Sequence, residues 1–83
     1  MDKKTERVLS IYGRLSKGEL INKKREAERF GVNERTIQRD IDDIRAFLAE
    51  EHGANDELVY DRARKGYCIK RDILKLLTPS EIF

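Results

Sequence analysis

Residues 33–50 constrain the fold of this chain more than any other stretch, because an apolar side chain returns there at helical spacing. The four apolar residues follow at intervals of four, three and four positions: Ile37, Ile41, Ile44 and Leu48. This pattern predicts a helix with one narrow buried face. Asn33 is a favoured N-cap residue, and Val32 before it can pack on the first isoleucine as a hydrophobic staple. We expect Phe47 to widen the buried face and Gly53 to end the helix.

Two shorter helices are predicted before this one. Over residues 5–16 the apolar side chains recur at helical spacing: Val8, Leu9, Tyr12 and Leu15. Lys17-Gly18 supplies the stop, since glycine can adopt the left-handed cap conformation. A second helix begins after Asn22, a good N-cap, and ends near Phe30. Glu26 lies in that short helix at a position where an apolar residue would be easier to explain.

After an acidic loop at residues 54–57, the apolar period changes from helical to alternating, which predicts two short strands. The alternating residues are Leu58 and Tyr60 in the first strand and Tyr67 and Ile69 in the second. Between them the turn DRARKG ends in Gly66, which can supply a positive φ. Both tyrosines are in register with the aliphatic residues, so we expect them to face the core and Cys68 to face the opposite side.

The last seven residues, LTPSEIF, carry a helix-start signature. Thr78 at the N-cap, Pro79 at the first helical position and Glu81 at the third form a capping box. Only two residues follow it, so we expect the chain to be the N-terminal piece of a longer protein. Residues 1–71 would form one domain, and residues 72–83 would lead to an absent effector or dimerisation domain.

Composition limits what the chain can be. Its 83 residues are 39% apolar and 41% charged, which suits one compact domain with a modest core. The chain has no apolar run of the ~20 residues that a membrane span needs, and its first residues do not resemble a secretory signal. A single cysteine and a single histidine exclude a disulfide and a Cys/His metal site within one chain. We therefore expect a cytoplasmic protein that is not an enzyme and has no cofactor, metal or small-molecule site.

The net charge of +2 hides an uneven distribution. Residues 14–39 hold eight basic and four acidic side chains, a balance of +4. Residues 40–57 hold seven acidic side chains and one basic, a balance of −6, and residues 58–71 return to +4 with five basic and one acidic. If folding brings the two basic blocks together, the surface would suit contacts to DNA phosphates. Charge runs are also common on faces that are simply solvated.

Helix, helix, tight turn, helix and basic hairpin is the order of a winged helix-turn-helix, a mainly α fold with three helices and a small β-hairpin wing. In this fold the third helix lies in the DNA major groove and reads base edges from its N-terminal residues. Arg35 suits guanine edges and Gln38 suits adenine edges. Arg39 could contact a base or a phosphate, and Thr36 could reach a phosphate. The same spacing taken alone also occurs on solvated helix faces.

The other candidate contacts also have two interpretations. Lys23 and Lys24, at the start of the second helix, could bind a phosphate or could only aid solubility. Arg62, Arg64 and Lys65 would form the wing on the backbone or in the minor groove, or else protect an edge strand from aggregation.

The third helix changes sign along its length. We expect DNA contact to end after Arg39, with Asp42 and Asp43 facing solvent or neighbouring basic side chains.

The sequence resembles one family of DNA-binding proteins. GVNERTIQRDIDDIRAFL is similar to the VS-x-x-T-I-x-R-D-I helix of winged helix-turn-helix regulators of the DeoR-like and, more closely, WYL-domain type, with Asn33 in place of the usual serine cap. LVYDRARKGYCI resembles their Y-D-x-x-x-x-G-Y-x-I wing, and LTPSEI resembles the start of their linker. Glu26 departs from the family's usual apolar residue. The resemblance implies a dimeric transcription regulator in which Asp40 braces a basic side chain, Arg7 or Arg14.

The predicted function is sequence-specific binding of double-stranded DNA by a domain of a homodimeric regulator, with recognition helix 33–50 and wing 61–67. The predicted contacts are Lys23, Lys24, Asn33, Arg35, Thr36, Gln38, Arg39, Arg62, Arg64 and Lys65. The alternative is a winged helix that binds another protein, because the acidic block and the apolar tail at residues 73–77 are compatible with a protein contact. RNA binding is a weaker third hypothesis, since the chain has no aromatic stacking motif of the RNP type.

Overall fold

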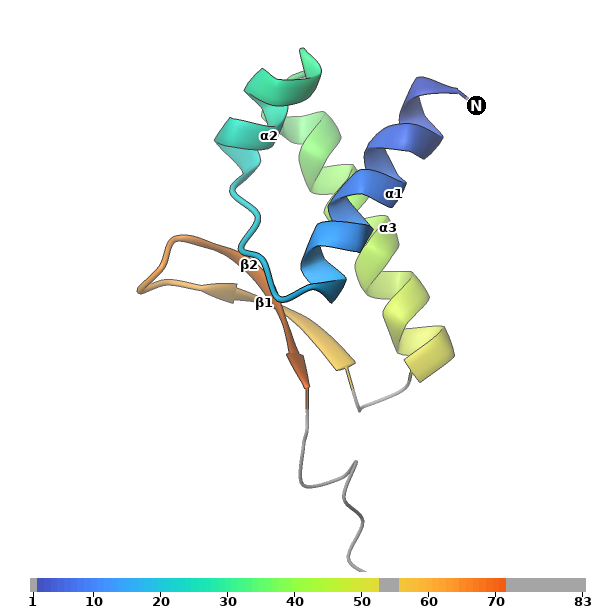
Figure 1. Ribbon diagram of the computed structural model, residues 1–83, viewed down its shortest axis with the longest axis vertical. Helices are drawn as coiled ribbons and strands as arrows, with labels where there is room; N and C mark the ends of the chain where they lie inside the picture. Colours follow the sequence, from blue (N-terminus) through green and yellow to red (C-terminus); the bar gives the residue numbers. More distant parts are fainter. Residues whose placement is uncertain (1, 53–55, 72–83) are drawn as a thin grey trace, which may run out of the picture.

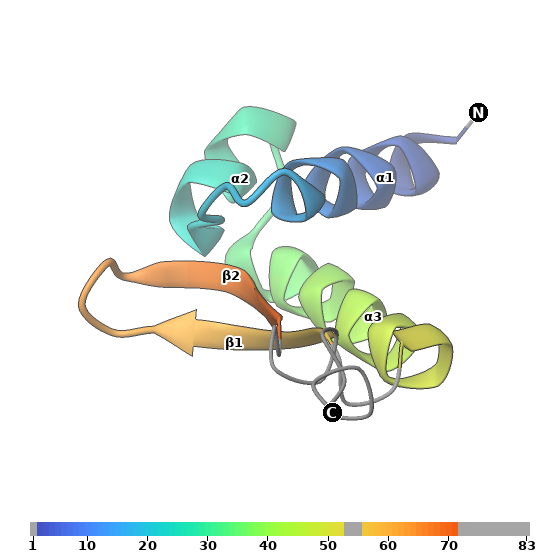
Figure 2. The same ribbon diagram turned by 60° about the horizontal axis from the view of Figure 1, so that its bottom comes forward.

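The computed structural model describes residues 2–52 and 56–71, which form three helices and one antiparallel hairpin (Figure 1). The elements are α1 (Lys3–Ser16), α2 (Lys23–Phe30), α3 (Glu34–His52), β1 (Asp56–Asp61) and β2 (Gly66–Arg71). α1 lies beside α3, and both α2 and β1 pack against α3. The hairpin turn points away from the helices in both views (Figures 1 and 2). The predicted mainly helical architecture with one small hairpin is confirmed.

The ends of α1 and α2 follow from their capping residues. α1 begins two residues earlier than predicted, because Asp2 Oδ1 accepts a hydrogen bond from the Thr5 backbone N–H at 2.8 Å. That hydrogen bond lowers the pKa of Asp2. After α1, Gly18 has the predicted positive φ, at 88°. α2 begins after Asn22, whose side chain accepts from the Arg25 N–H at 3.0 Å, as predicted. A left-handed Gly31 follows it.

α3 has the buried face that its sequence predicts. The four residues of that face are no more than 3% exposed: Ile37, Ile41, Ile44 and Leu48. Asn33 caps the helix by accepting from the Thr36 N–H at 2.8 Å. The helix continues to His52, two residues past the predicted recognition helix 33–50, and Gly53, the expected stop, lies outside the described residues.

The expectation for Phe47 is wrong. Its side chain is 46% exposed and sits at the edge of α3 rather than in the core. There it makes an edge-to-face contact with Tyr12 of α1, with ring centroids 5.8 Å apart. Neighbouring aromatic rings on two helices thus form a partly exposed apolar surface.

The hairpin pairs Leu58 with Ile69 and Tyr60 with Tyr67. Asp56 and Glu57 belong to β1, so the predicted acidic loop is wrong for these two residues. Leu58 is buried and Tyr67 packs against the core, as predicted. Tyr60 is not part of the core, because its side chain is 48% exposed. Its ring packs on its cross-strand partner instead, with centroids 5.0 Å apart.

The hairpin is fixed to the chain between α1 and α2. Ile21 and Tyr67 exchange two backbone hydrogen bonds, of 2.8 and 2.7 Å, in an antiparallel bridge. Beside the bridge, a Cβ on Gly66 would lie 2.6 Å from Leu20 Cγ. Close packing therefore favours glycine here, since a larger residue would require Leu20 to move, and Gly66 does not have the positive φ considered from the sequence. The positive φ of the turn belongs to Lys65, at 57°.

The predicted capping box at residues 78–81 and the predicted linker at residues 72–83 lie outside the described residues. Within the described part of the chain, no helix combines the length and the apolar character that crossing a membrane requires.

Candidate nucleic-acid interface

Two arginines stand free on the first turns of α3. Arg35 and Arg39 are both exposed, on the side of the helix away from its buried isoleucines. Within residues 2–52 and 56–71, neither guanidinium has a hydrogen-bond or ion-pair partner. An unpaired guanidinium presents five N–H donors in a fixed plane, which suits guanine edges and phosphates. These two predicted contact residues therefore have their donors available.

Gln38, the third predicted base reader, is half-buried and already bonded. Its Oε1 accepts from Lys23 Nζ at 2.9 Å and from the Tyr67 hydroxyl at 3.2 Å. Its Nε2 donates to Asp42 Oδ1 at 3.0 Å. Unlike Arg35, Gln38 therefore does not present free polar atoms, and the adenine contact expected from the sequence would compete with these hydrogen bonds. The polar atoms of its side chain are used within the domain, and they connect α3 to α2 and to β2.

The remaining predicted contacts around the turn before α3 differ in availability. Lys24 is exposed and, among the described residues, has no partner, whereas the Lys23 ammonium is bonded to the Gln38 amide. Asn33 Oδ1 is occupied by two donors of Thr36, the backbone N–H and the hydroxyl at 3.0 Å. The Asn33 amide N–H groups remain able to reach a phosphate, while the Thr36 hydroxyl is committed to the cap.

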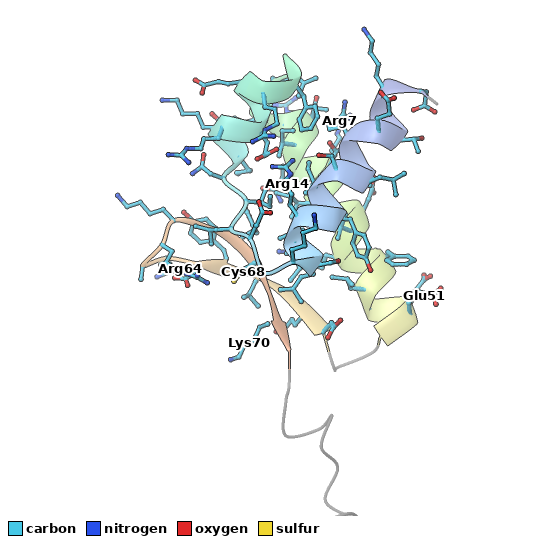
Figure 3. All side chains as sticks on the ribbon, viewed as in Figure 1. Arg7, Arg14, Glu51, Arg64, Cys68 and Lys70 are labelled. Carbon is cyan, nitrogen blue, oxygen red and sulfur yellow. The ribbon has the colours of Figure 1, made fainter. Side chains whose placement is uncertain are left out.

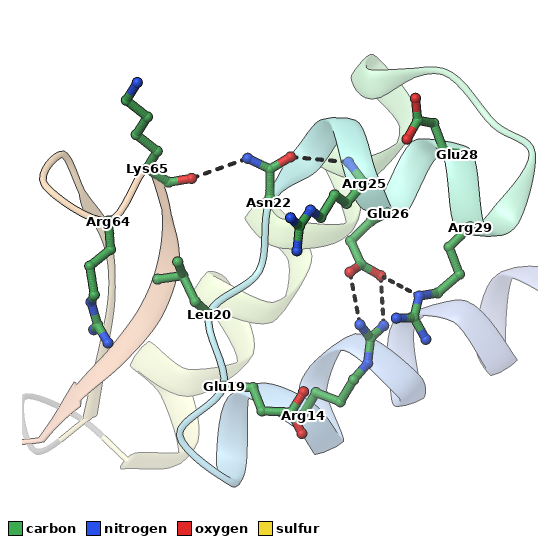
Figure 4. A pocket seen from close by; sticks show the side chains of 10 residues that line it. All are labelled: Arg14, Glu19, Leu20, Asn22, Arg25, Glu26, Glu28, Arg29, Arg64 and Lys65. Carbon is green, nitrogen blue, oxygen red and sulfur yellow. Dashed lines mark hydrogen bonds and ion pairs between the residues drawn. The ribbon is translucent and has the colours of Figure 1, made fainter.

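The hairpin turn, residues 62–65, holds three predicted contacts. Arg64 Nε donates to Asp61 Oδ2 at 2.9 Å, and this hydrogen bond lowers the pKa of Asp61. Arg62 and Lys65 are exposed, and neither side chain has a partner in the described residues. The turn therefore presents two free cations and one that is partly neutralised. The Lys65 backbone carbonyl accepts from Asn22 Nδ2 at 3.1 Å, which joins the turn to the start of α2 (Figure 4).

Two further arginines lie inside the domain, each on a carboxylate. Arg7 of α1 donates through Nε and Nη2 to Asp40 of α3, which is 1% exposed. The predicted bracing role of Asp40 is thus confirmed, with Arg7 as its partner. Arg14 donates to both oxygens of Glu26, at 2.7 and 2.8 Å (Figure 4). Each of these hydrogen-bonded pairs raises the pKa of its arginine.

The Arg14–Glu26 pair explains the polar residue in α2. Glu26 is 4% exposed and also lies 3.8 Å from Arg29. Sequence reasoning missed this pairing, although Glu26 in an otherwise apolar position was its signal. Beside it a groove of 770 Å³ runs between α2 and the hairpin turn (Figure 4). Its lining mixes five basic and three acidic residues, and Glu26 is already paired within it.

The acidic end of α3 lies away from the hairpin turn (Figure 3). Arg64 on the hairpin and Glu51 near the end of α3 are on opposite sides of the molecule (Figure 3). Asp42 accepts from Arg45 at 3.2 Å, and Asp43 lies 3.7 Å from Lys4, so both face basic side chains as predicted. The change of sign along α3 therefore separates a free basic end from an acidic end whose charges are partly paired.

Within the described residues, no group of three or more His, Cys, Asp or Glu side chains could hold a metal ion. Cys68 is a free, half-buried thiol in β2. No family model, curated protein or solved structure matches this chain.

Proposed function

We propose that this domain binds double-stranded DNA sequence-specifically as a winged helix-turn-helix, within a homodimeric transcription regulator. α3 enters the major groove with Arg35 and Arg39 toward base edges or phosphates. The turn at residues 62–65 is the wing and contacts the backbone or the minor groove. Lys24 and the amide of Asn33 contribute phosphate contacts at the start of the two helices.

The observation that carries this proposal is the contrast between paired and free cations. Arg7 and Arg14 are each bonded to a carboxylate inside the domain. Arg35 and Arg39 have no partner within the described residues and lie on a helix that is packed through four buried aliphatic residues. Arg62 and Lys65 are unpaired on the hairpin turn. Free cations on a capped, well-packed helix and a projecting turn suit a polyanionic duplex.

Selection of binding sites from random duplex DNA tests the proposal directly. We expect an enriched motif, and an inverted repeat with half-sites about one helical turn apart, or a multiple of it, would indicate a dimer. Binding to the selected site should weaken steeply as salt rises, because each phosphate contact releases counterions. Unenriched output, or affinity that barely changes between low and physiological salt, would contradict the proposal.

Single substitutions on α3 then separate contact from folding. Arg35→Ala and Arg39→Ala should each weaken binding to the selected site by roughly 10- to 100-fold, because a good arginine–base contact is worth about 1–3 kcal/mol. Their free energies of unfolding should stay within about 0.5 kcal/mol of wild type, since both side chains are exposed and unpaired. Lys70→Ala is a matched control, because Lys70 is an exposed cation of β2 away from the turn (Figure 3).

A second candidate function is binding to another protein through the α1–α3 surface. Phe47 and Leu9 are about half exposed, at 46% and 53%, and Tyr12 contacts the Phe47 ring. Leu9 lies three residues before Tyr12, so both are on neighbouring positions of one helix face. Arg35→Glu with Arg39→Glu should abolish DNA binding and leave such a contact intact, whereas Leu9→Ser with Phe47→Ser should do the reverse.

A further inference from the structure

We propose that Gln38 is a positioning residue that holds the three DNA-contacting elements together, and that it does not read a base. This inference rests on the proposed function and replaces the adenine contact expected from the sequence. The side chains concerned are Gln38 of α3, Lys23 of α2, Tyr67 of β2 and Asp42 of α3, which we call the Gln38 network.

The chemistry of its partners fixes the orientation of the Gln38 amide. A lysine ammonium can only donate, so the amide oxygen must face Lys23. An ionised carboxylate can only accept, so the amide nitrogen must face Asp42. The Tyr67 hydroxyl donates to the same oxygen. Reversing the amide would place its N–H groups against the ammonium and its oxygen against the carboxylate.

The occupied oxygen leaves Gln38 poorly suited to adenine. A bidentate contact requires Oε1 to accept from the adenine N6 amino group while Nε2 donates to N7. Oε1 already accepts a charge-assisted hydrogen bond and a hydroxyl, so a base contact would break both. Breaking the first would leave the ammonium of Lys23 without its partner. Arg35 and Arg39, which have no such bonds to give up, are left as the base readers.

The network also joins the elements that the proposed interface needs. Lys23 stands at the N-terminus of α2, and its ammonium is held toward the first turns of α3. Tyr67 belongs to β2, and its backbone is bonded to Ile21 just before α2. One amide oxygen therefore connects the start of α2, the reading end of α3 and the hairpin. Loss of this connection should disturb the relative placement of all three, whatever the DNA sequence.

The test compares base preference with overall affinity in the 83-residue chain. We would measure binding of the wild type, Gln38→Met, Lys23→Met and Tyr67→Phe to the selected site and to all its single-base-pair variants. Methionine keeps the volume of glutamine but accepts no hydrogen bond from an ammonium, and phenylalanine removes only the hydroxyl. Circular dichroism during urea unfolding would report whether each variant remains folded.

If Gln38 is a positioning residue, Gln38→Met and Tyr67→Phe should each weaken binding to the selected DNA site roughly three- to tenfold. This is the loss expected for one or two hydrogen bonds. The order of base preference should stay that of the wild type at every position. Gln38→Met and Lys23→Met should combine less than additively, because they remove the same interaction. Tyr67→Phe is informative because its side chain is half-buried in the hairpin and leaves the α3 surface unchanged.

Two results would contradict the inference, and they differ in what happens to the wild type. If Gln38→Met loses discrimination at one base pair and Tyr67→Phe binds like the wild type, Gln38 reads a base and the inference fails while DNA binding stands. If the wild-type chain selects no sequence at all, the proposed function fails and the inference fails with it. The two failures are thus distinguished by the behaviour of the wild type alone.

Discussion

The arginines of the interior and those of the α3 surface are the same side chain in opposite situations. Arg7 and Arg14 each donate to both oxygens of a carboxylate that is 5% exposed or less. Arg35 and Arg39 are exposed and unpaired within the described residues. A buried guanidinium must be paired because desolvation of a lone charge is costly. An exposed guanidinium is solvated by water and can remain unpaired until it binds another molecule. The difference shows which cations serve folding and which are available for binding.

The largest expected effect comes from breaking the most buried pair. Asp40→Ala leaves Arg7 buried without its carboxylate, and should lower the free energy of unfolding by about 3–5 kcal/mol. Asp43→Ala is the matched control, because the Lys4–Asp43 pair is 3.7 Å long and more than half exposed on both sides. It should cost less than about 1 kcal/mol. Urea denaturation followed by circular dichroism measures both, and equal losses would contradict the contrast between the two sets of charges.

A smaller effect should follow from breaking the Arg14–Glu26 pair, and removing both of its members should reverse most of that effect. Glu26→Leu alone leaves Arg14 without its partner and should cost about 2–3 kcal/mol, less than the Asp40 variant because the Arg14 side chain is 16% exposed. Glu26→Leu with Arg14→Met should recover to within about 1 kcal/mol of wild type, since well-packed apolar side chains often replace an ion pair at no loss. A double-mutant cycle on unfolding measures the coupling. Additive losses would mean that the pair contributes nothing of its own.

The smallest effect concerns Arg64, the cation of the hairpin turn that is paired with a carboxylate. The Arg64 side chain lowers the pKa of Asp61 below its ordinary 3.8. A lowered folded-state pKa contributes stability above the unfolded value, and that contribution is lost as the pH falls through the folded value. Asp61→Asn should therefore flatten the dependence of stability on pH below about 4. Thermal unfolding between pH 2 and pH 6 checks this, and an unchanged slope would contradict it.

The same substitution sharpens the proposal for the wing. Asp61→Asn removes a negative charge and frees Arg64 for phosphate, so DNA binding should tighten modestly and its salt dependence should steepen. Arg64→Gln serves as the matched change, since it removes the cation and leaves Asp61 with only the backbone N–H of residue 64 as a partner. Unchanged affinity in both variants would mean that the hairpin turn lies away from the duplex.

The sequence predicted the elements well because local signals decide them. Asn22 and Asn33 cap the helices that follow, and the isoleucine spacing in α3 defined its buried face. These features depend on neighbours within one or two turns, which periodicity and capping rules capture. The start of α1 was misplaced only because Asp2 was not recognised as its cap.

The errors occur where a side chain depends on a neighbour from another element. Gln38 is turned inward by Lys23 and Tyr67, which are 15 and 29 residues away along the chain. Glu26 is acceptable in the interior only because Arg14 reaches it from α1. Tyr60 shares a sheet face with Leu58 but is 48% exposed, and strand alternation predicts only the face of a residue, not what covers it. The winged-helix assignment and the DNA contacts remain predictions.

The close contact at Gly66 separates the packed base of the hairpin, where substitution is costly, from the exposed turn, where side chains can change. A Cβ there would lie 2.6 Å from Leu20 Cγ, so Leu20 would have to move, and the adjacent bridge between Ile21 and Tyr67 fixes the base of the hairpin. The side chains of residues 62–65 lie beyond that anchor and are exposed. Mutations that alter the charge or size of these side chains need not disturb the packing of the core. In evolutionary terms, Gly66 marks the border beyond which the surface of the hairpin could change while the fold is kept.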